Sequence, residues 1–262
     1  MDIIIKGYLK RFVEEFGLDK NENDVNFEKL CYYTILNNEL NHLDDNDLDE
    51  ISIGKNKGID GICFAIDGRI ITNMSEIEDL RDAERNFDAS IYFIQAKTSS
   101  KFSDSEIANF CDTTIDFLSA KPKYTLTPKA KEYHDIYLEL LKLLSFLKSF
   151  NCKLFYCSAG LWRKDKTCST TLSIKKEQLV KNGNFKDDDV EIIAVDNEKL
   201  RKLYDKATKP LNTEFTFAQK TTLKEIDHVK ESYIGILPFD EFRKIIIDKD
   251  TEKLKPLFSD NV

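Results

Sequence analysis

The fold is decided by Gly58-Ile59-Asp60-Gly61-Ile62-Cys63-Phe64-Ala65-Ile66 together with Ile91-Tyr92-Phe93-Ile94-Gln95-Ala96-Lys97. Both runs are short and rich in β-branched and aromatic residues, which predicts two buried strands. Side chains at positions i and i+2 of a strand share a face, so Gln95 and Lys97 point the same way. Asp60 joins them if the two strands pair, which makes one polar cluster beside an apolar sheet.

This combination of residue types suits metal-dependent phosphodiester chemistry. Mg²⁺ is a hard ion that takes oxygen ligands, and Asp60 offers a carboxylate while Gln95 offers an amide carbonyl. A bound metal acidifies water and stabilises a phosphorane-like transition state, and a lysine at Lys97 can position that water and offset developing charge. The spacing is equally compatible with Asp60 as a turn residue and Lys97 as a solvated strand end.

Composition indicates a globular protein without a membrane segment. The chain has 262 residues, of which 41% are hydrophobic and 33% charged. It contains no run of about 18 apolar residues, and its start lacks the basic and apolar regions of a signal peptide. The six cysteines fall mostly in apolar patterns without a C-x-x-C pair, so we expect buried thiols in a reducing cytosol and a cytoplasmic location.

The formal net charge is −8, which argues against a protein that coats nucleic acid non-specifically, because such affinity comes from neutralising phosphates. It does not exclude a nuclease, since acidic active sites tolerate phosphate once metal is bound. The acidic run at 44–50 lacks the spacing of a calcium loop, and we expect it to be a solvated loop.

The order of patterns predicts an α/β domain with a mixed sheet. Apolar periodicity indicates helices ending at Gly17 and over about 25–40, 107–118, 128–150, 172–181, 196–204 and 239–246, with a loop or short exposed helix at 74–89. Strands are expected at about 59–66, 69–73, 91–97, 152–159, 190–195, 213–219 and 232–237. We expect one domain over 1–207 and a C-terminal extension over 208–262 that leads to a larger region missing from this chain.

The motifs resemble the PD-(D/E)xK nuclease core and, more closely, the nuclease-like N-terminal region of the abortive-infection phage-resistance (AIPR) family. The likeness covers nearly the whole chain and is carried by five stretches, namely 58–66, 93–99, Phe102 to Ile107, Leu154 to Gly160 with Trp162, and the ending Pro256 to Val262. It implies a restriction-endonuclease-like α/β core, a mixed central sheet flanked by helices, and a Mg²⁺- or Mn²⁺-dependent endonuclease of antiviral defence.

The resemblance also implies a ligand set. Asp60, Gln95 and the backbone carbonyl of Ala96 would hold the metal, and Lys97 would serve the nucleophile. Gln95 departs from the usual Asp or Glu and leaves the site one charge short. Many members of the superfamily carry a glutamate on a helix before the first core strand, and Glu28 is the candidate here, with a plain surface glutamate as the alternative.

We therefore expect a nuclease module that cuts DNA, with RNA as the second choice of substrate. The alternative is a catalytically silent nuclease-like domain that binds nucleic acid or a protein partner. No membrane partner is expected, and the sequence leaves a homo-oligomer open. Trp162, Arg163, Lys164 and Lys166 follow a predicted strand end, where an aromatic ring and cations can meet an unpaired base or a phosphate.

Overall fold

The structure is a computed structural model, and it describes residues 1–40, 43, 45–54, 58–83, 85–162, 166–182, 185–208, 213–223, 232–247 and 255. The chain divides into two compact units, Met1–Ala207 and Thr208–Val262. This division falls at the residue where the sequence patterns placed the domain boundary. The ending at 256–262, which contributed to the AIPR resemblance, lies outside the described residues.

A mixed five-stranded sheet forms the centre of the first unit, with the strand order β2-β1-β3-β4-β5. Its strands are β1 (Gly61–Ile66), β2 (Arg69–Ile71), β3 (Phe87–Lys97), β4 (Leu147–Ser158) and β5 (Val190–Val195). β1 pairs antiparallel with both β2 and β3, whereas β3, β4 and β5 run parallel to one another. The predicted pairing of the two decisive strands is therefore confirmed.

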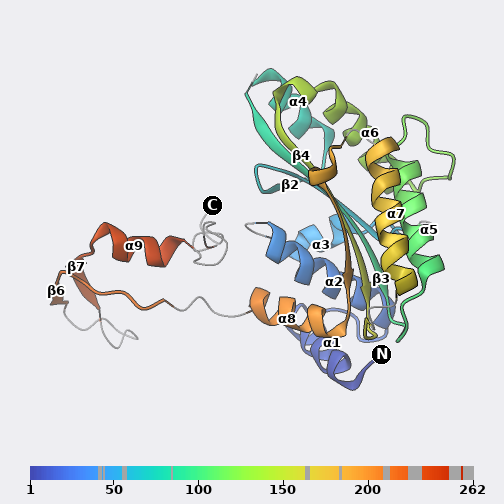
Figure 1. The fold of residues 1–262 in the computed structure, drawn as a ribbon. Helices are drawn as coiled ribbons and strands as arrows, with labels where there is room; N and C mark the ends of the chain where they lie inside the picture. Colours follow the sequence, from blue (N-terminus) through green and yellow to red (C-terminus); the bar gives the residue numbers. More distant parts are fainter. Residues whose placement is uncertain are drawn as a thin grey trace. The chain divides into compact units, whose positions relative to one another are not determined.

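Helices cover both faces of this sheet (Figure 1). One buried cluster joins the sheet to α4 (Met74–Asp82), α5 (Asp104–Phe117), α6 (Pro128–Lys142) and α7 (Lys166–Asn182). A second buried cluster joins the opposite face to α1 (Ile3–Glu15), α2 (Asn23–Glu39), α3 (Asp45–Ile51) and α8 (Asn197–Thr208). The alternation of strand side chains decides which cluster each residue enters, and it gives the sheet an α5 face and an α2 face.

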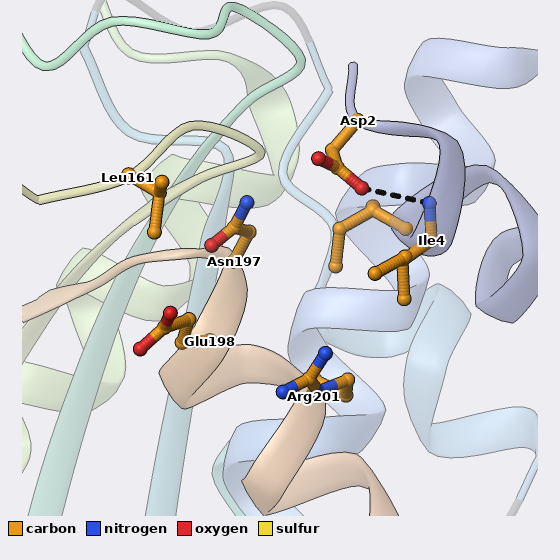
Figure 2. Close-up of a pocket in the computed structure, with 7 residues that line it drawn as sticks. Asp2, Ile4, Leu161, Asn197, Glu198 and Arg201 are labelled. Atoms are coloured by element: carbon orange, nitrogen blue, oxygen red, sulfur yellow. Dashed lines mark hydrogen bonds between the residues drawn. The ribbon is translucent and has the colours of Figure 1, made fainter.

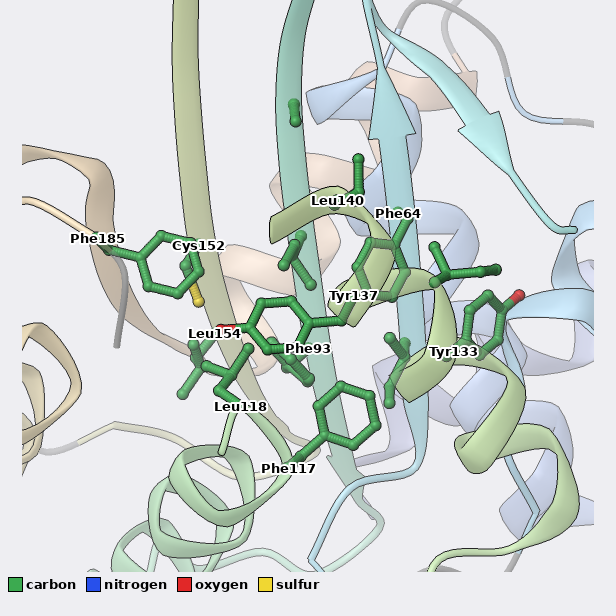
Figure 3. Close-up of a cluster of buried hydrophobic side chains, with 14 of the residues drawn as sticks. Phe64, Phe93, Phe117, Leu118, Tyr133, Tyr137, Leu140, Cys152, Leu154 and Phe185 are labelled. Carbon is green, nitrogen blue, oxygen red and sulfur yellow. The ribbon is translucent and has the colours of Figure 1, made fainter. Parts of the chain in front are cut away.

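The core on the α5 face is rich in aromatic rings. Figure 3 shows Phe64, Phe93, Phe117, Tyr133 and Tyr137 gathered between the sheet and the helices. The Phe93 and Phe117 ring centroids lie 5.5 Å apart in an edge-to-face arrangement, and those of Phe64 and Tyr133 lie 5.8 Å apart and stacked. Such rings bury much apolar area and favour these offset geometries, so this cluster holds the strands against their helices.

Several local features follow from short-range chemistry. Asp67 and Gly68 have φ angles of 49° and 81°, and they close the β1–β2 hairpin with Ile66 opposite Arg69. Two positive φ angles define the type I′ turn that Asp-Gly favours. Thr127 caps α6 with Pro128 in its first turn, and all six cysteines are buried without any disulfide.

Three secondary-structure assignments differ from those that the sequence patterns predict. They are the acidic run at 44–50, the end of the helix that begins at 128 and the start of the strand that follows it. The acidic run expected as a loop is the helix α3, because Leu48 and Ile51 bury their side chains beneath an otherwise polar stretch. The helix expected to reach residue 150 ends at Lys142, and β4 already begins at Leu147. Apolar runs that are buried in either state cannot be divided by periodicity alone, and here pairing with β3 sets the boundary.

The second unit contains β6 (Gln219–Thr222), β7 (Tyr233–Ile236) and α9 (Phe239–Ile246) among its described residues. β6 and β7 pair antiparallel, so the strand expected at 213–219 lies later in the chain. In the described part of the whole chain, no helix has the length and apolar character needed to cross a membrane.

Candidate metal and phosphodiester site

Asp60 stands at the entrance to β1 and is tied to β3 by two hydrogen bonds. Its backbone N–H donates to the Ile94 carbonyl at 3.0 Å. Its carboxylate Oδ2 accepts from the Ala96 N–H at 2.8 Å. The carboxylate is thereby held against the segment that carries Gln95 and Lys97. The convergence of the Asp60 carboxylate with the Gln95 amide and the Lys97 amine stays a prediction.

Gln95 and Lys97 extend the row of β3 side chains that begins with Ile91 and Phe93, and this row lies on the α5 face. Gln95 is only 3% exposed, and its side-chain Oε1 has no hydrogen-bond partner among the described residues. A buried amide oxygen without a partner is costly, so it marks a position where a cation or a water is expected. Lys97 is partly exposed at the strand end.

The Ala96 carbonyl is directed toward Asp60. The Lys97 carbonyl accepts from Ala159 on the β4 side, whereas the Ile94 carbonyl accepts from Asp60 on the β1 side. Successive carbonyls of a strand alternate between its two neighbours, so the Ala96 carbonyl shares the direction of Ile94. It therefore points to the side where the Asp60 carboxylate lies.

Glu28 approaches from the α2 face of the sheet. It is half-buried, while its neighbours Phe27 and Leu30 are fully buried, as the helical spacing predicts. The pKa of Glu28 is raised to about 7, chiefly by burial and then by the charge of Asp60, while the charge of Lys97 opposes this rise. Glu28, Asp60 and Lys97 thus share one electrostatic environment, although they come from three separate elements.

Burial also raises the pKa of Asp60, while the hydrogen bond from Ala96 and the charge of Lys97 act in the opposite direction. Two carboxyl groups that are both difficult to ionise gain most from a nearby cation. The Asp60 carboxylate, the Ala96 carbonyl and the partnerless Gln95 oxygen are oxygen donors of the kind that suits Mg²⁺ or Mn²⁺, and Glu28 reaches the charge of Asp60 from the opposite face of the sheet. No group of three or more His, Cys, Asp or Glu suited to a metal occurs among the described residues.

The structure adds two residues that the sequence patterns missed. Tyr156 of β4 is the register partner of Gln95, and its hydroxyl donates to Glu106 of α5 at 3.0 Å. The charge of Asp60 contributes to the raised pKa of Tyr156, behind burial and Glu106 itself. Glu106 therefore places a further carboxylate beside the site. Its signal was its position in the first turn of the helix that follows Lys97.

Tyr32 of α2 packs against the start of β1, next to Asp60 in the chain. Its hydroxyl is fully buried and has no hydrogen-bond partner in the described part of the chain. A Cβ added at Gly61 would lie 2.7 Å from the Tyr32 ring, so only glycine lets this ring pack over the start of β1. Burial raises the pKa of Tyr32, and the charges of Glu28 and Asp60 raise it further.

Two open grooves flank the turn after Lys97. One has a volume of about 600 Å³ and is lined by Thr98, Asp24 and three lysines, Lys6, Lys10 and Lys20. The other, of about 690 Å³, is lined by Ser100, Lys101, Phe102 and the end of β4. A third, smaller pocket of about 140 Å³ lies between the starts of α1 and α8, and Figure 2 shows Asp2, Asn197 and Arg201 around it. None of the residues predicted from the sequence to hold metal or serve catalysis, namely Glu28, Asp60, Gln95, Ala96 and Lys97, lines any of these three.

We compared the chain with protein-family models, with curated proteins and with solved structures, and none of these searches found a match. The likeness to PD-(D/E)xK nucleases therefore stays a prediction from the motifs. The functional argument rests on the geometry of Asp60, Gln95, Ala96, Lys97 and Glu28.

Proposed function

We propose that residues 1–207 form a metal-dependent nuclease module of restriction-endonuclease-like architecture, which belongs to an AIPR-type anti-phage defence protein and hydrolyses DNA, with RNA as the second choice. The observation that carries this proposal is the Asp60 carboxylate, held 2.8 Å from the Ala96 N–H between Gln95 and Lys97. A mixed sheet flanked by helices, with this cluster at the ends of β1 and β3, supports the same reading.

Asp60, Gln95, Ala96 and Glu28 would hold the divalent ion. When bound, that ion lowers the pKa of a coordinated water and neutralises charge on the scissile phosphate. Lys97 extends from the end of β3 and can donate to the phosphate or to the attacking water, which stabilises the charge that develops in the transition state. Its position two residues after Gln95 keeps its side chain on the same face of β3 as Gln95.

Glu28 would bind the metal directly or through a water. Without metal its pKa is raised to about 7, chiefly by burial, and a bound cation would favour its ionised form. The Ala96 N–H already occupies one oxygen of Asp60, which would leave the other oxygen for the metal.

The second candidate function is a silent nuclease-like domain that binds nucleic acid or a protein partner. Two observations favour it, namely the neutral amide at Gln95 and the formal net charge of −8. An amide contributes no charge to metal binding, and a negative surface weakens the attraction of phosphates. Catalysis and silent binding make opposite predictions for a metal titration.

The test is cleavage of end-labelled DNA and RNA, single-stranded and duplex, by the full chain in Mg²⁺, Mn²⁺ or a chelator. We expect metal-dependent cutting that falls by about 10²-fold or more in Asp60→Ala and in Lys97→Ala. Asp188→Ala and Lys121→Ala are matched controls at exposed positions and should cut at the wild-type rate. Absence of cutting in every metal would favour the silent domain, and an active Asp60→Ala protein would place the chemistry elsewhere.

A further inference from the structure

The groove of about 690 Å³ lies where the parallel strands β3 and β4 end, which is where open α/β sheets bind ligands. Two aromatic residues, Phe102 and Trp162, form part of its wall, and both are partly exposed. Their ring centroids lie 4.8 Å apart with the planes at 84°, so the rings make a corner. A flat ligand can stack on one ring while its edge meets the other.

This corner is rigid. The Phe102 ring also packs on Tyr156 at 5.6 Å, and the Trp162 backbone N–H donates to the Asp196 carboxylate at 3.1 Å. A Cβ at Gly160 would lie 2.2 Å from the Ser100 carbonyl oxygen, so the two chain segments touch at a point where only glycine fits. A preorganised aromatic corner loses little freedom on binding, which favours a ligand site over incidental packing.

Two hydrogen bonds fix the position of the Phe102–Trp162 corner relative to Lys97. The Ala159 N–H donates to the Lys97 carbonyl at 3.0 Å, and the Ser158 hydroxyl donates to the Ser99 carbonyl at 3.0 Å. These bonds pin the segment between Lys97 and Phe102 to the end of β4. The five residue steps from Lys97 to Phe102 span at most about 18 Å. One bound strand can therefore place a base at the corner and a phosphate at Lys97.

We propose that this groove stacks an unpaired base of single-stranded nucleic acid, and that it thereby selects single-stranded substrates for the neighbouring site. The proposal rests on the proposed nuclease function for its purpose, but base binding is measurable without cutting. In a duplex both faces of each base are covered by its neighbours, so only an unpaired or extruded base can reach the corner.

Charge near the corner is close to balanced among the described lining residues. Lys101 and Asp2 line the aromatic groove, and the groove on the other side of the same turn is lined by three lysines (Lys6, Lys10 and Lys20) and two carboxylates (Glu14 and Asp24). Met1 lines both grooves, so the two form neighbouring surfaces around residues 98–102. A few lysines on a chain of net charge −8 can contact only a short stretch of the nucleic-acid phosphate backbone. Stacking therefore has to supply the remaining affinity. Arg163 and Lys164 lie outside the described residues.

The single tryptophan of the chain makes the test direct, since Trp162 is the only source of tryptophan fluorescence. We would titrate the full chain with oligothymidylate, oligouridylate and a blunt DNA duplex, with a chelator present to prevent cutting. We expect saturable quenching by one or both single strands and little by the duplex, and the two oligomers separate DNA from RNA. Equal quenching by the duplex, or none by either single strand, would overturn the proposal.

Variants separate this inference from the proposed catalysis. Phe102→Leu and Trp162→Leu should weaken binding of a labelled oligothymidylate by about fivefold or more in fluorescence anisotropy, whereas Tyr124→Leu, at an exposed aromatic outside the groove, should bind normally. Asp60→Ala should keep the quenching. If Asp60→Ala abolishes cutting while folded Phe102→Leu and Trp162→Leu proteins bind and cut like wild type, the base site is wrong and the nuclease stands. Quenching of Trp162 by single strands, without cutting in any metal, would support the base site and overturn the proposed nuclease function.

Discussion

Gln95 supplies a neutral amide oxygen at a position where a carboxylate would bind a divalent cation more tightly. Its Oε1 is buried without a partner in the described structure, and Glu28 of α2 has a raised pKa to which the charge of Asp60 contributes. We predict that Gln95→Glu tightens Mn²⁺ binding and that Glu28→Gln weakens it, because hard cations respond to the number of charged ligands. The double variant should lie between the two.

Isothermal calorimetry on these four proteins measures the effect, and Glu14→Gln, an exposed glutamate of α1, is the control. If Mn²⁺ affinity is unchanged in both single variants, neither side chain contacts the metal. The silent binding domain then becomes the better account of this fold.

The shifted pKa of Glu28 predicts an unusual pH dependence of stability. Its carboxyl binds a proton more tightly in the folded chain, with a pKa of about 7 against 4.5 when unperturbed. The folded state therefore holds more protons than the unfolded state between these values, and the free energy of unfolding falls as pH rises through this window. The pKa of Asp60 is raised as well and adds an effect of the same sign.

We expect the urea midpoint of the metal-free protein to fall from about pH 5 to about pH 8, and Glu28→Gln to flatten this slope. The Glu14→Gln protein should keep it. A Glu28→Gln protein with the wild-type slope would show that Glu28 is solvated and does not share the environment of Asp60.

At the scale of helices and strands, the sequence patterns predicted the features that depend on interactions between residues close together in the chain. The buried strands β1 and β3 and the start of α6 at Pro128 have the predicted outcome. The Asp67-Gly68 turn and the cap at Thr127 show why, because turn geometry, capping and strand alternation act over a few residues. The pairing of Asp60 with β3 followed from one assumption about neighbouring strands. Glu106 and Tyr156 were not predictable, since their contact joins residues 50 positions apart and depends on how α5 crosses the sheet.

Gly160 tests how the ends of β3 and β4 are held together. Gly160→Ala would force a Cβ to within 2.2 Å of the Ser100 carbonyl, so the turn that follows Lys97 must shift. We expect a loss of about 1–3 kcal/mol in the free energy of unfolding, with weaker oligonucleotide binding. Gly7 is the control, because it lies exposed in α1 with nothing within 4 Å of an added Cβ.

In the Gly7→Ala protein the same chemical change should raise stability by about 0.5–1 kcal/mol, as expected for a helix interior. Urea unfolding of both proteins gives the comparison. Equal effects of the two substitutions would mean that the end of β4 does not approach Ser100 as closely as the structure places it.

At the scale of the whole molecule, the two compact units bury very different amounts of apolar surface. Both hydrophobic clusters lie in the first unit, whereas none of the described residues of the second unit is fully buried. Phe239 is 71% exposed, and the two-stranded β6–β7 pair has every residue exposed. An isolated pair of strands is marginally stable in water, so the first unit supplies the cooperative stability of the chain.

We therefore predict that a fragment of residues 1–207 folds alone and melts within a few degrees of the full chain, because it retains the sheet, both clusters and the candidate site. It should also keep Mn²⁺ binding and the quenching of Trp162 by single strands, since every residue invoked for either lies before 207. A fragment of 208–262 should show no cooperative transition by circular dichroism. If residues 1–207 instead melt far below the full chain, the second unit contributes stability through contacts with the first, and the candidate site would have to be studied in the intact protein.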